Sequence, residues 1–377
     1  MKKILALILT VIILFSFSAC GENSGWTEDN QITITKSDVR KIINGKFKTP
    51  KNIILIIGDG MGVNDIEATE IYSEEKFDFG LVLSQIKNQG FATTKSFDSD
   101  VTDSAASATA LSTGVKTRNG YIGVDIYGEN LTTMAEYSRE HGKKVGIITN
   151  EEIYGATPSA FTVHNLSRNK SKEIINDFIH FKPDVLMGNY NDYIFNNLET
   201  EEKDILENEY ICELKSSEFE KSAAADANKP FIGFIEKYAP LPSYDLAKSS
   251  KFAFERLKND NGFFVMIESA GTDKFGHNND MNGKIASVIT LDRTVAAALL
   301  FMKENPDTLL IVTSDHETGG VMKPTGEEED LDTLFTATSH TGADVKVFAV
   351  GKGSEYFNNK TVDNTDIAKF IKKAIKG

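Results

Sequence analysis

The chain has 377 residues, of which 40% are hydrophobic, and it carries a formal net charge of −14 at pH 7 with a pI near 5.0. A chain of this length and composition can bury a large core, which argues against disorder. The excess of acid argues against a nucleic-acid-binding surface, because proteins that bind the phosphate backbone present clustered Lys and Arg. It instead suits sites at which bound cations neutralise carboxylates.

Residues 1–20 have the pattern of a lipoprotein-type signal peptide. Two lysines precede an apolar stretch, residues 4–17, that is too short to span a bilayer. The sequence FSACG at residues 17–21 resembles a bacterial lipobox. The resemblance implies that Cys20 is lipidated and that the mature protein is extracytoplasmic, anchored to the bacterial cell membrane. Cleavage without lipidation, which would give a secreted or periplasmic protein, is the alternative.

The polar residues 21–50 are expected to form a tether between this anchor and the folded part of the chain. Once Cys20 is used, Cys212 is the only other cysteine in the sequence, so an intrachain disulfide is excluded. Stability must therefore come from packing, with bound metals as a further source.

Strands and helices are predicted to alternate along residues 51–377, which we expect to form a single catalytic domain. Strands are expected at residues 51–57, 143–149, 184–187, 231–234, 263–268, 308–313 and 345–350, and helices at 131–141, 244–257, 285–303 and 366–375. This alternation predicts a doubly wound α/β fold, with a mostly parallel central sheet and helices on both faces. Residues 190–260, rich in Glu, Lys and Asn, are expected to be a peripheral insertion packed on the main sheet.

A candidate nucleophile, Ser104, lies in the stretch VTDSAASATAL at residues 101–111. Small residues follow an Asp-Ser pair, so Ser104 is expected at or near a helix N-terminus with Asp103 beside it. The unpaired N–H groups of a first helical turn suit a phosphate or a developing oxyanion. The alternative is that Asp103 and Ser104 only cap the helix.

Acidic and imidazole side chains recur where the predicted strands end. In open α/β sheets, ligands bind at the carboxyl ends of the strands. Mixed Asp/His ligation fits zinc, whereas carboxylate and hydroxyl oxygens fit magnesium. The recurrence predicts a metal site made by Asp59, Glu268, Asp273, His277, Asp315, His316 and His340. The remaining histidines lie near a helix terminus or in expected helical segments, which favours structural roles for His141, His164 and His180.

Several motifs together resemble those of the alkaline phosphatase family, in family order from about residue 51 to the C-terminus. They are residues 58–62, 102–110, 156–158, Arg168, Glu268, 273–274, His277, 313–320 and 339–342. The resemblance implies the fold of that family and the hydrolysis of phosphate monoesters to an alcohol and inorganic phosphate.

Residue roles follow from the same resemblance. Ser104 would be the nucleophile that becomes phosphorylated, and Arg168 would grip two phosphate oxygens, a bidentate task that suits Arg. The implied metal ligands form three sets: Asp273, His277 and His340 for one zinc ion; Asp59, Asp315 and His316 for a second; and Asp59, Thr157 and Glu268 for magnesium.

The implied chemistry agrees with physical expectation. A serine hydroxyl is a poor nucleophile at neutral pH, and the sequence shows no histidine in an obvious triad, so zinc coordination is the economical way to activate Ser104. The other zinc ion would stabilise the departing alkoxide and then activate a water, since zinc can lower the pKa of bound water to about 7. Two displacements through one serine predict retention of configuration at phosphorus.

Gly155 departs from the family pattern. Many relatives carry an Asp or His two residues before Thr157, where this chain has Gly155, so we expect a weaker or differently supported magnesium site. Lys274 resembles a lysine that contacts phosphate through water in bacterial relatives; the alternative is a surface lysine. A homodimer is implied by the family resemblance alone.

Three other functions are alternatives to phosphomonoester hydrolysis. A sulfatase is disfavoured, because neither cysteine lies in a Cys-x-Pro-x-Arg motif. A phosphodiesterase of the same superfamily could use the same metals, although Arg168 favours a terminal phosphate. A non-catalytic lipoprotein that only binds phosphate or metal would be expected to have lost its nucleophile or a primary ligand, and neither is lost.

Overall fold

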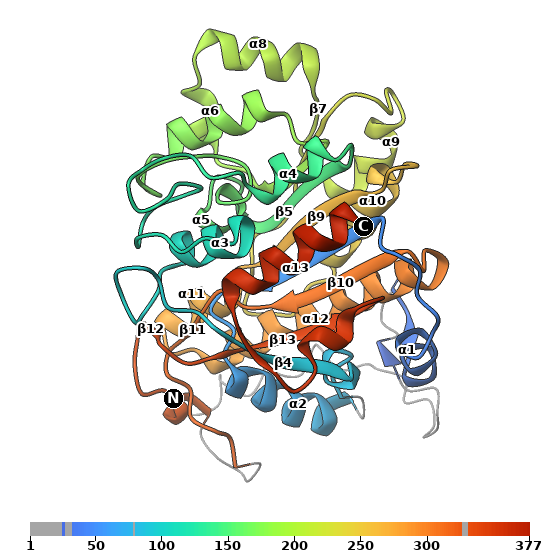
Figure 1. Ribbon diagram of the computed structural model, residues 1–377, viewed down its shortest axis with the longest axis vertical. Helices are drawn as coiled ribbons and strands as arrows, with labels where there is room; N and C mark the ends of the chain where they lie inside the picture. Colours follow the sequence, from blue (N-terminus) through green and yellow to red (C-terminus); the bar gives the residue numbers. More distant parts are fainter. Residues whose placement is uncertain (1–24, 27–31, 78–79, 326–330) are drawn as a thin grey trace, which may run out of the picture.

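A ten-stranded β-sheet forms the centre of the protein, with helices on both of its faces (Figure 1). The computed structural model describes residues 25–26, 32–77, 80–325 and 331–377. The signal peptide predicted at residues 1–20, including Cys20, lies outside the described residues. In spatial order the strands are β14 (Thr361–Asp363), β4 (Asn88–Thr93), β13 (Val345–Val350), β10 (Thr308–Thr313), β3 (Asn52–Gly58), β9 (Phe263–Ser269), β5 (Lys144–Glu152), β6 (Val185–Asn189), β8 (Phe231–Phe234) and β7 (Ile211–Glu213).

Strand direction confirms the predicted mostly parallel α/β fold. Of these described strands, β13 alone runs antiparallel, to β10 on one side and β4 on the other. The other neighbouring pairs are parallel. Two small antiparallel ladders lie outside this sheet, one of β1 (Gly25–Trp26) with β2 (Ile34–Thr35) and one of β11 (Glu317–Thr318) with β12 (His340–Thr341).

Two hydrophobic cores, one on each face of the sheet, result from the alternation of side chains along the strands. In β3 all seven residues are buried: Ile54 and Ile56 join one core, and Ile53, Leu55 and Ile57 join the other. Helices α1 (Lys36–Ile43), α2 (Val63–Phe77), α9 (Phe219–Ala223), α10 (Asp245–Leu257) and α12 (Met281–Glu304) cover the first core. Helices α3 (Ser104–Thr113), α4 (Met134–Glu140), α5 (Ala156–Ser159), α6 (Ser171–Phe181) and α13 (Asn364–Lys376) cover the second.

The longest described helix, α12, is a core element. It is long and apolar enough to cross a membrane, but 94% of its most apolar window is buried inside the protein. The remaining helices are α7 (Asp192–Asn196), α8 (Thr200–Glu209), α11 (Gly271–His277) and the short 3₁₀ turns Leu83–Gln85, Ser216–Glu218, Leu331–Leu334 and Ser354–Phe357.

The tether expected at residues 21–50 is wrong for its second half. Helix α1 begins with a capping box, in which Thr35 and Asp38 each accept a hydrogen bond from the other's backbone N–H. Val39 and Ile42 are buried in the first core. The few apolar residues of this polar segment thus dock it onto the sheet's helical layer.

Residues 190–260 also differ from the expectation of an insertion packed on the sheet. Strands β8 and β7 continue the sheet itself, each pairing in parallel at its outer edge. Helix α10 packs against the core helix α12. This region therefore extends the sheet. The short apolar stretch at residues 231–234 forms one of the added strands, β8.

Candidate active site and metal centre

The predicted metal ligands gather at the carboxyl edge of four neighbouring parallel strands, β10, β3, β9 and β5. Asp59 follows β3, Glu268 is the next-to-last residue of β9, Asp315 follows β10, and Thr157 lies in α5 after β5. All four side chains are buried. The fold thus brings Asp59, Glu268 and Asp315, which the strand-end pattern predicted, to one edge of the sheet, together with Thr157, which the family resemblance implied.

The first group of converging side chains consists of Asp59, Asp315 and His316. Nε2 of His316 lies 3.4 Å from Asp59 Oδ1 and 3.3 Å from Asp315 Oδ2. Ser104 Oγ lies 3.2 Å from the same nitrogen. The ligand atoms of the three residues are close enough to hold one metal ion, and the predicted nucleophile therefore borders a candidate metal site.

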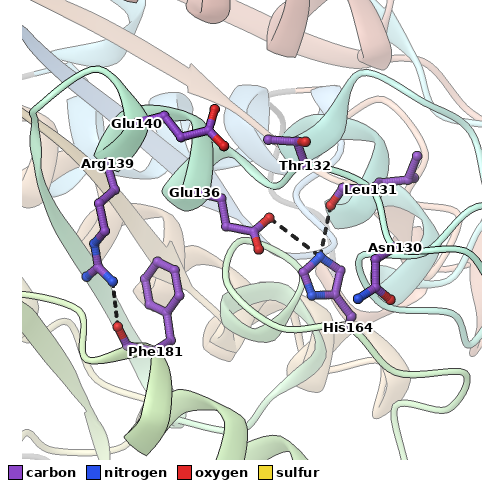
Figure 2. Close-up of a pocket in the computed structure, with 8 residues that line it drawn as sticks. All are labelled: Asn130, Leu131, Thr132, Glu136, Arg139, Glu140, His164 and Phe181. Atoms are coloured by element: carbon purple, nitrogen blue, oxygen red, sulfur yellow. Dashed lines mark hydrogen bonds and ion pairs between the residues drawn. The ribbon is translucent and has the colours of Figure 1, made fainter.

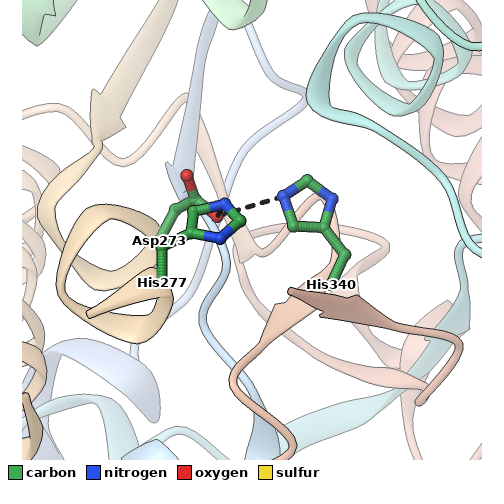
Figure 3. Close-up of side chains that lie close together, drawn as sticks. All are labelled: Asp273, His277 and His340. Carbon is green, nitrogen blue, oxygen red and sulfur yellow. Dashed lines mark ion pairs between the residues drawn. The ribbon is translucent and has the colours of Figure 1, made fainter. Parts of the chain in front are cut away.

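A second group consists of Asp273, His277 and His340, and both imidazoles turn toward the Asp273 carboxylate (Figure 3). Nε2 of His277 lies 3.3 Å from Asp273 Oδ1, and Nε2 of His340 lies 3.2 Å from the same oxygen. One turn of α11 brings Asp273 and His277 together, as their spacing predicted. The His340 ring stacks on the His316 ring at a centroid distance of 3.6 Å, so the two groups lie side by side.

Backbone carbonyls orient the histidines of the second group. Nδ1 of His277 lies 2.8 Å from the Thr338 carbonyl oxygen, and Nδ1 of His340 lies 2.9 Å from that of Thr102. A carbonyl oxygen only accepts, so each Nδ1 carries the proton. In the neutral ring Nε2 then has the lone pair with which histidine binds a metal. Asp273 raises the pKa of both histidines, so a bound cation would take the place of the proton on Nε2.

The third predicted set shares Asp59 with the first group. Thr149 in β5 donates its hydroxyl to Glu268 Oε2. The Thr157 hydroxyl lies near Glu268 and helps to lower that residue's pKa, although burial raises it overall. Asp59 and Glu268 are close enough for their charges to interact. The residues predicted to hold magnesium therefore share one buried corner of the site.

Electrostatics favours cations at this edge of the sheet. Burial, followed by the charge of Asp273, raises the pKa of Asp59 to about 7. Burial and the charge of Asp59 raise the pKa values of Glu268 and Asp315 well above their usual range. Buried carboxylates oppose one another's ionisation, and a bound cation removes that opposition.

The hydrogen-bond inventory of the site also fits bound cations. Within the described part of the chain, three buried oxygens at the site make no hydrogen bond of acceptable geometry: Asp59 Oδ1, Asp315 Oδ2 and Thr157 Oγ1. Buried polar atoms usually have partners, and an ion would satisfy these oxygens. The donor set is mixed Asp/His in the first two groups and oxygen-only in the third, as zinc and magnesium respectively prefer.

Ser104 is the first residue of α3, and Asp103 is its N-cap. Asp103 Oδ1 accepts from the Ala106 N–H at 2.9 Å, while Oδ2 lies 3.1 Å from Arg168 Nη1. The sequence suggested that Asp103 and Ser104 cap the helix, and the structure shows that Asp103 alone is the cap. One carboxylate thus caps the helix that begins with the predicted nucleophile and holds the arginine predicted to bind phosphate.

Arg168 lies in a turn before α6, and its backbone N–H donates to the Gly120 carbonyl at 2.9 Å. The helical placement expected for His164 is wrong, because His164 lies in a loop, where Nε2 is 2.9 Å from the Leu131 carbonyl oxygen. The structural role predicted for His164 agrees with these contacts.

Lys274 is anchored at the rim of the site. Its Nζ lies 3.1 Å from Glu151 Oε1 and 3.5 Å from Asp273 Oδ2, and its side chain is 27% exposed. Burial opposes its charge, but Asp59, Glu151 and Asp273 raise its pKa overall. These contacts are unlike those of a free surface lysine.

A separate hollow of about 410 Å³ lies away from the metal ligands (Figure 2). It is lined by Asn130, Leu131, Thr132, Glu136, Arg139, Glu140, His164 and Phe181. None of these is a predicted site residue. Two of its charged side chains have partners: Glu136 pairs with His164, and Arg139 donates to the Phe181 carbonyl.

Two residues of the site were missed from the sequence. Thr318 Oγ1 contacts both Asp273 and His316, yet nothing distinguishes it from other residues of its glycine-rich loop. Glu151 contacts Lys274 because of a local irregularity in β5, which apolar periodicity does not reveal.

Comparison with known proteins places this geometry in a family. The family model described as "Alkaline phosphatase" matches residues 50–207 and 235–330, more than half of the chain. "Alkaline phosphatase 3" of Bacillus subtilis is 28% identical, with 100% of this chain and 98% of that relative covered. The alkaline phosphatase of Escherichia coli is 29% identical, with 87% of this chain and 86% of the relative covered.

Solved structures give the same result. The alkaline phosphatase from the Antarctic bacterium TAB5 is 31% identical with a TM-score of 0.75, covering 88% of this chain and 99% of that chain. The sequence motifs, the sheet and the paired ligand groups therefore agree with the family match. The chain belongs to the alkaline phosphatase family of metal-binding hydrolases.

Proposed function

We propose that the protein is an alkaline phosphatase that hydrolyses phosphate monoesters to an alcohol and inorganic phosphate through a phosphoserine at Ser104. The observation that carries this proposal is the 3.2 Å approach of Ser104 Oγ to Nε2 of His316, at the border of the Asp59, Asp315 and His316 group. A nucleophile next to a cation-binding group is the arrangement that a two-metal phosphatase needs.

We propose zinc for the two mixed Asp/His groups and magnesium for the third set, with the ligands that the family resemblance implies. The unpaired buried oxygens of Asp59, Asp315 and Thr157 support this assignment. A solved variant of the TAB5 enzyme, 32% identical to this chain, is described with magnesium bound in its M3 site. When bound, such cations lower the pKa of a coordinated hydroxyl or water and offset negative charge on the reacting oxygens.

The protein's own groups then have distinct tasks. Arg168, held by Asp103, binds two oxygens of a terminal phosphate, and Ser104 Oγ attacks phosphorus as the alcohol leaves. Water next attacks the phosphoserine on phosphorus, which releases inorganic phosphate and returns the Ser104 hydroxyl. Each displacement inverts phosphorus, so the overall reaction retains configuration.

The decisive experiment is an assay of the purified protein, with zinc and magnesium, on p-nitrophenyl phosphate at alkaline pH. We expect hydrolysis that Ser104→Ala abolishes. Wild-type turnover in Ser104→Ala would exclude the phosphoserine. An inert wild-type protein that still binds phosphate would instead favour the non-catalytic binding protein. Preferential hydrolysis of bis(p-nitrophenyl) phosphate would favour the phosphodiesterase.

We also propose an extracytoplasmic location with a lipid anchor at Cys20, supported by the signal-peptide and lipobox patterns of residues 1–21. Lipidation converts a soluble domain into a membrane-anchored one. Cys20→Ser is therefore expected to move the protein from the membrane fraction to the soluble fraction after cell fractionation. Equal membrane association of both proteins would exclude the anchor. Homodimerisation stays a prediction from the family resemblance.

A further inference from the structure

Gly155 lies two residues before Thr157, a member of the third cation set with Asp59 and Glu268. It has no side chain that could support this set. Its backbone, at φ −54° and ψ 159°, lies in a region open to any residue, so the dihedral angles do not require glycine. A Cβ placed on Gly155 would lie 3.1 Å from the Glu152 carbonyl oxygen, a tight contact, and 3.5 Å from Glu151 Oε2. The Glu151 carboxylate is thus next to the position that a residue-155 side chain would take.

An irregularity in β5 aims Glu151 at this place. Between Ile148 and Glu152, three residues of β5 lie opposite Gly188 of β6. A Cβ on Gly188 would lie 3.0 Å from the Glu151 carbonyl oxygen, so the extra residues pack directly over this glycine. Bulges of this kind redirect side chains and are common beside active sites.

The contacts of Glu151 all lead to the candidate site. Its Oε1 lies 3.1 Å from Lys274 Nζ, and its backbone N–H donates to Thr149 Oγ1 at 3.0 Å. The Thr149 hydroxyl donates in turn to Glu268, so one short chain of hydrogen bonds ties Glu151 to a predicted magnesium ligand. The side chain is 17% exposed, and its charge interacts with those of Asp59 and Glu268.

We propose that Glu151 is a positioning residue for the third cation: its carboxylate replaces the side chain that Gly155 lacks, and it anchors Lys274 at the rim of the site. The third site is then supported by a carboxylate four residues before Gly155 and is not simply weakened by the glycine. This inference rests on the proposed function, because it takes the third set to hold magnesium.

Magnesium binding, measured separately from activity, tests the proposal. Magnesium is titrated by calorimetry into zinc-loaded protein, and Glu151→Gln is expected to weaken magnesium binding by about 10- to 100-fold, as lost outer-shell partners do. Zinc affinity is expected to stay the same. The matched control is Glu152→Gln, because the neighbouring Glu152 carboxylate pairs with Lys237 at 2.8 Å and not with Lys274.

A rescue variant separates positioning from a general structural role. Adding Gly155→Asp to Glu151→Gln returns a carboxylate to the same space, and recovery of magnesium affinity supports the exchange of roles. Equal magnesium affinity in Glu151→Gln and Glu152→Gln overturns the inference, as does a wild-type protein that binds no magnesium. A wild type that binds magnesium through Glu151 but hydrolyses no phosphate ester overturns the proposed function instead.

Discussion

Thr318 donates its hydroxyl proton to Asp273, with an Oγ1–Oδ1 distance of 2.7 Å. Nδ1 of His316 lies 3.2 Å from the same hydroxyl. Because the single hydroxyl proton goes to a carboxylate, which only accepts, Nδ1 of His316 must be the donor in the second contact. Nε2 of His316 is then left unprotonated, facing Ser104 and the carboxylates. One threonine thus orients a ligand from each of the two candidate zinc groups.

Replacing Thr318 with valine should therefore weaken zinc binding at both groups. We expect a loss of about 10- to 100-fold in affinity, the usual effect of removing a partner of a metal ligand. Competition with a chromophoric chelator measures it. Thr318→Ser keeps the hydroxyl and serves as the control, and equal zinc affinity in the valine and serine variants would contradict this role.

Asp103 should affect both stability and substrate binding, because its two oxygens have different partners. Asp103→Ala removes the N-cap of α3, at a cost of about 0.5–2 kcal/mol in the free energy of unfolding. It also releases Arg168, so KM for p-nitrophenyl phosphate should rise. Asp103→Asn keeps a capping oxygen and should recover the capping part of the stability, while it loses the acceptor for the Gly120 N–H and KM stays raised. An unchanged KM in both variants would show that Arg168 needs no such support.

Lys284 and Asp65 form an ion pair of 3.0 Å with both side chains fully buried. Lys284 also donates to the Thr318 carbonyl, and Asp65 accepts from the Gly62 N–H at 2.7 Å, so the pair supports two loops of the site. Lys284→Met leaves a buried charge unpaired and should lower the free energy of unfolding by about 3–5 kcal/mol. Urea denaturation measures this change.

The same helix α12 provides the control for that experiment. Lys303 pairs with Asp38 at 3.7 Å, and the lysine side chain is 53% exposed. Lys303→Met should change the free energy of unfolding by less than about 1 kcal/mol. Adding Asp65→Leu to Lys284→Met should recover part of the loss. Equal losses in Lys284→Met and Lys303→Met would show that burial of the Lys284–Asp65 pair does not increase its contribution to the free energy of unfolding.

The pair of His164 and Glu136, 3.5 Å apart, should make stability depend on pH. Burial opposes protonation of His164, but the hydrogen bonds to Glu136 and to the Leu131 carbonyl raise its pKa overall above 6.5. Burial likewise opposes ionisation of Glu136, but the hydrogen bonds to His164 and Thr133 lower its pKa overall below 4.5. Each shift therefore stabilises the charged form of its residue.

The signs of these shifts define a pH window. The stabilisation from His164 is complete below pH 6.5 and is lost as pH rises through its folded pKa, while that from Glu136 is complete above pH 4.5 and is lost as pH falls through its folded pKa. The free energy of unfolding lost in His164→Gln should be larger at about pH 5.5 than at about pH 8.5. This difference should be smaller in a Glu136→Gln background, where the Leu131 carbonyl still favours the protonated ring; an equal difference there would assign the effect to groups other than Glu136.

The sheet and the convergence of the candidate metal ligands were predictable because both follow from local sequence. A continuous apolar run such as residues 52–57 can be satisfied only when both faces of a strand are buried, and parallel strands bring their following residues to one edge. Asp59 and Asp315 were identified in this way.

Other features depend on partners distant in the sequence and were missed. Strand β4 reads NQGFAT, which has no clear apolar alternation, and it is a strand because β13 and β14 pair with it. Helix α1 lies in a polar segment and is fixed by a few apolar contacts with the core. The direction of Glu151 depends on how β5 bulges over Gly188, and the role of Thr318 depends on the distances to two side chains.

The spread of the ligands along the chain has a consequence for biogenesis. The Asp59 group requires Asp315 and His316, and the Asp273 group requires His340, so neither group is complete until most of the chain has been synthesised. The ligands also converge only after the parallel strands have paired. Cation loading should thus follow assembly of the sheet, and a truncated or misassembled chain would remain without its metals and so be open to proteolysis.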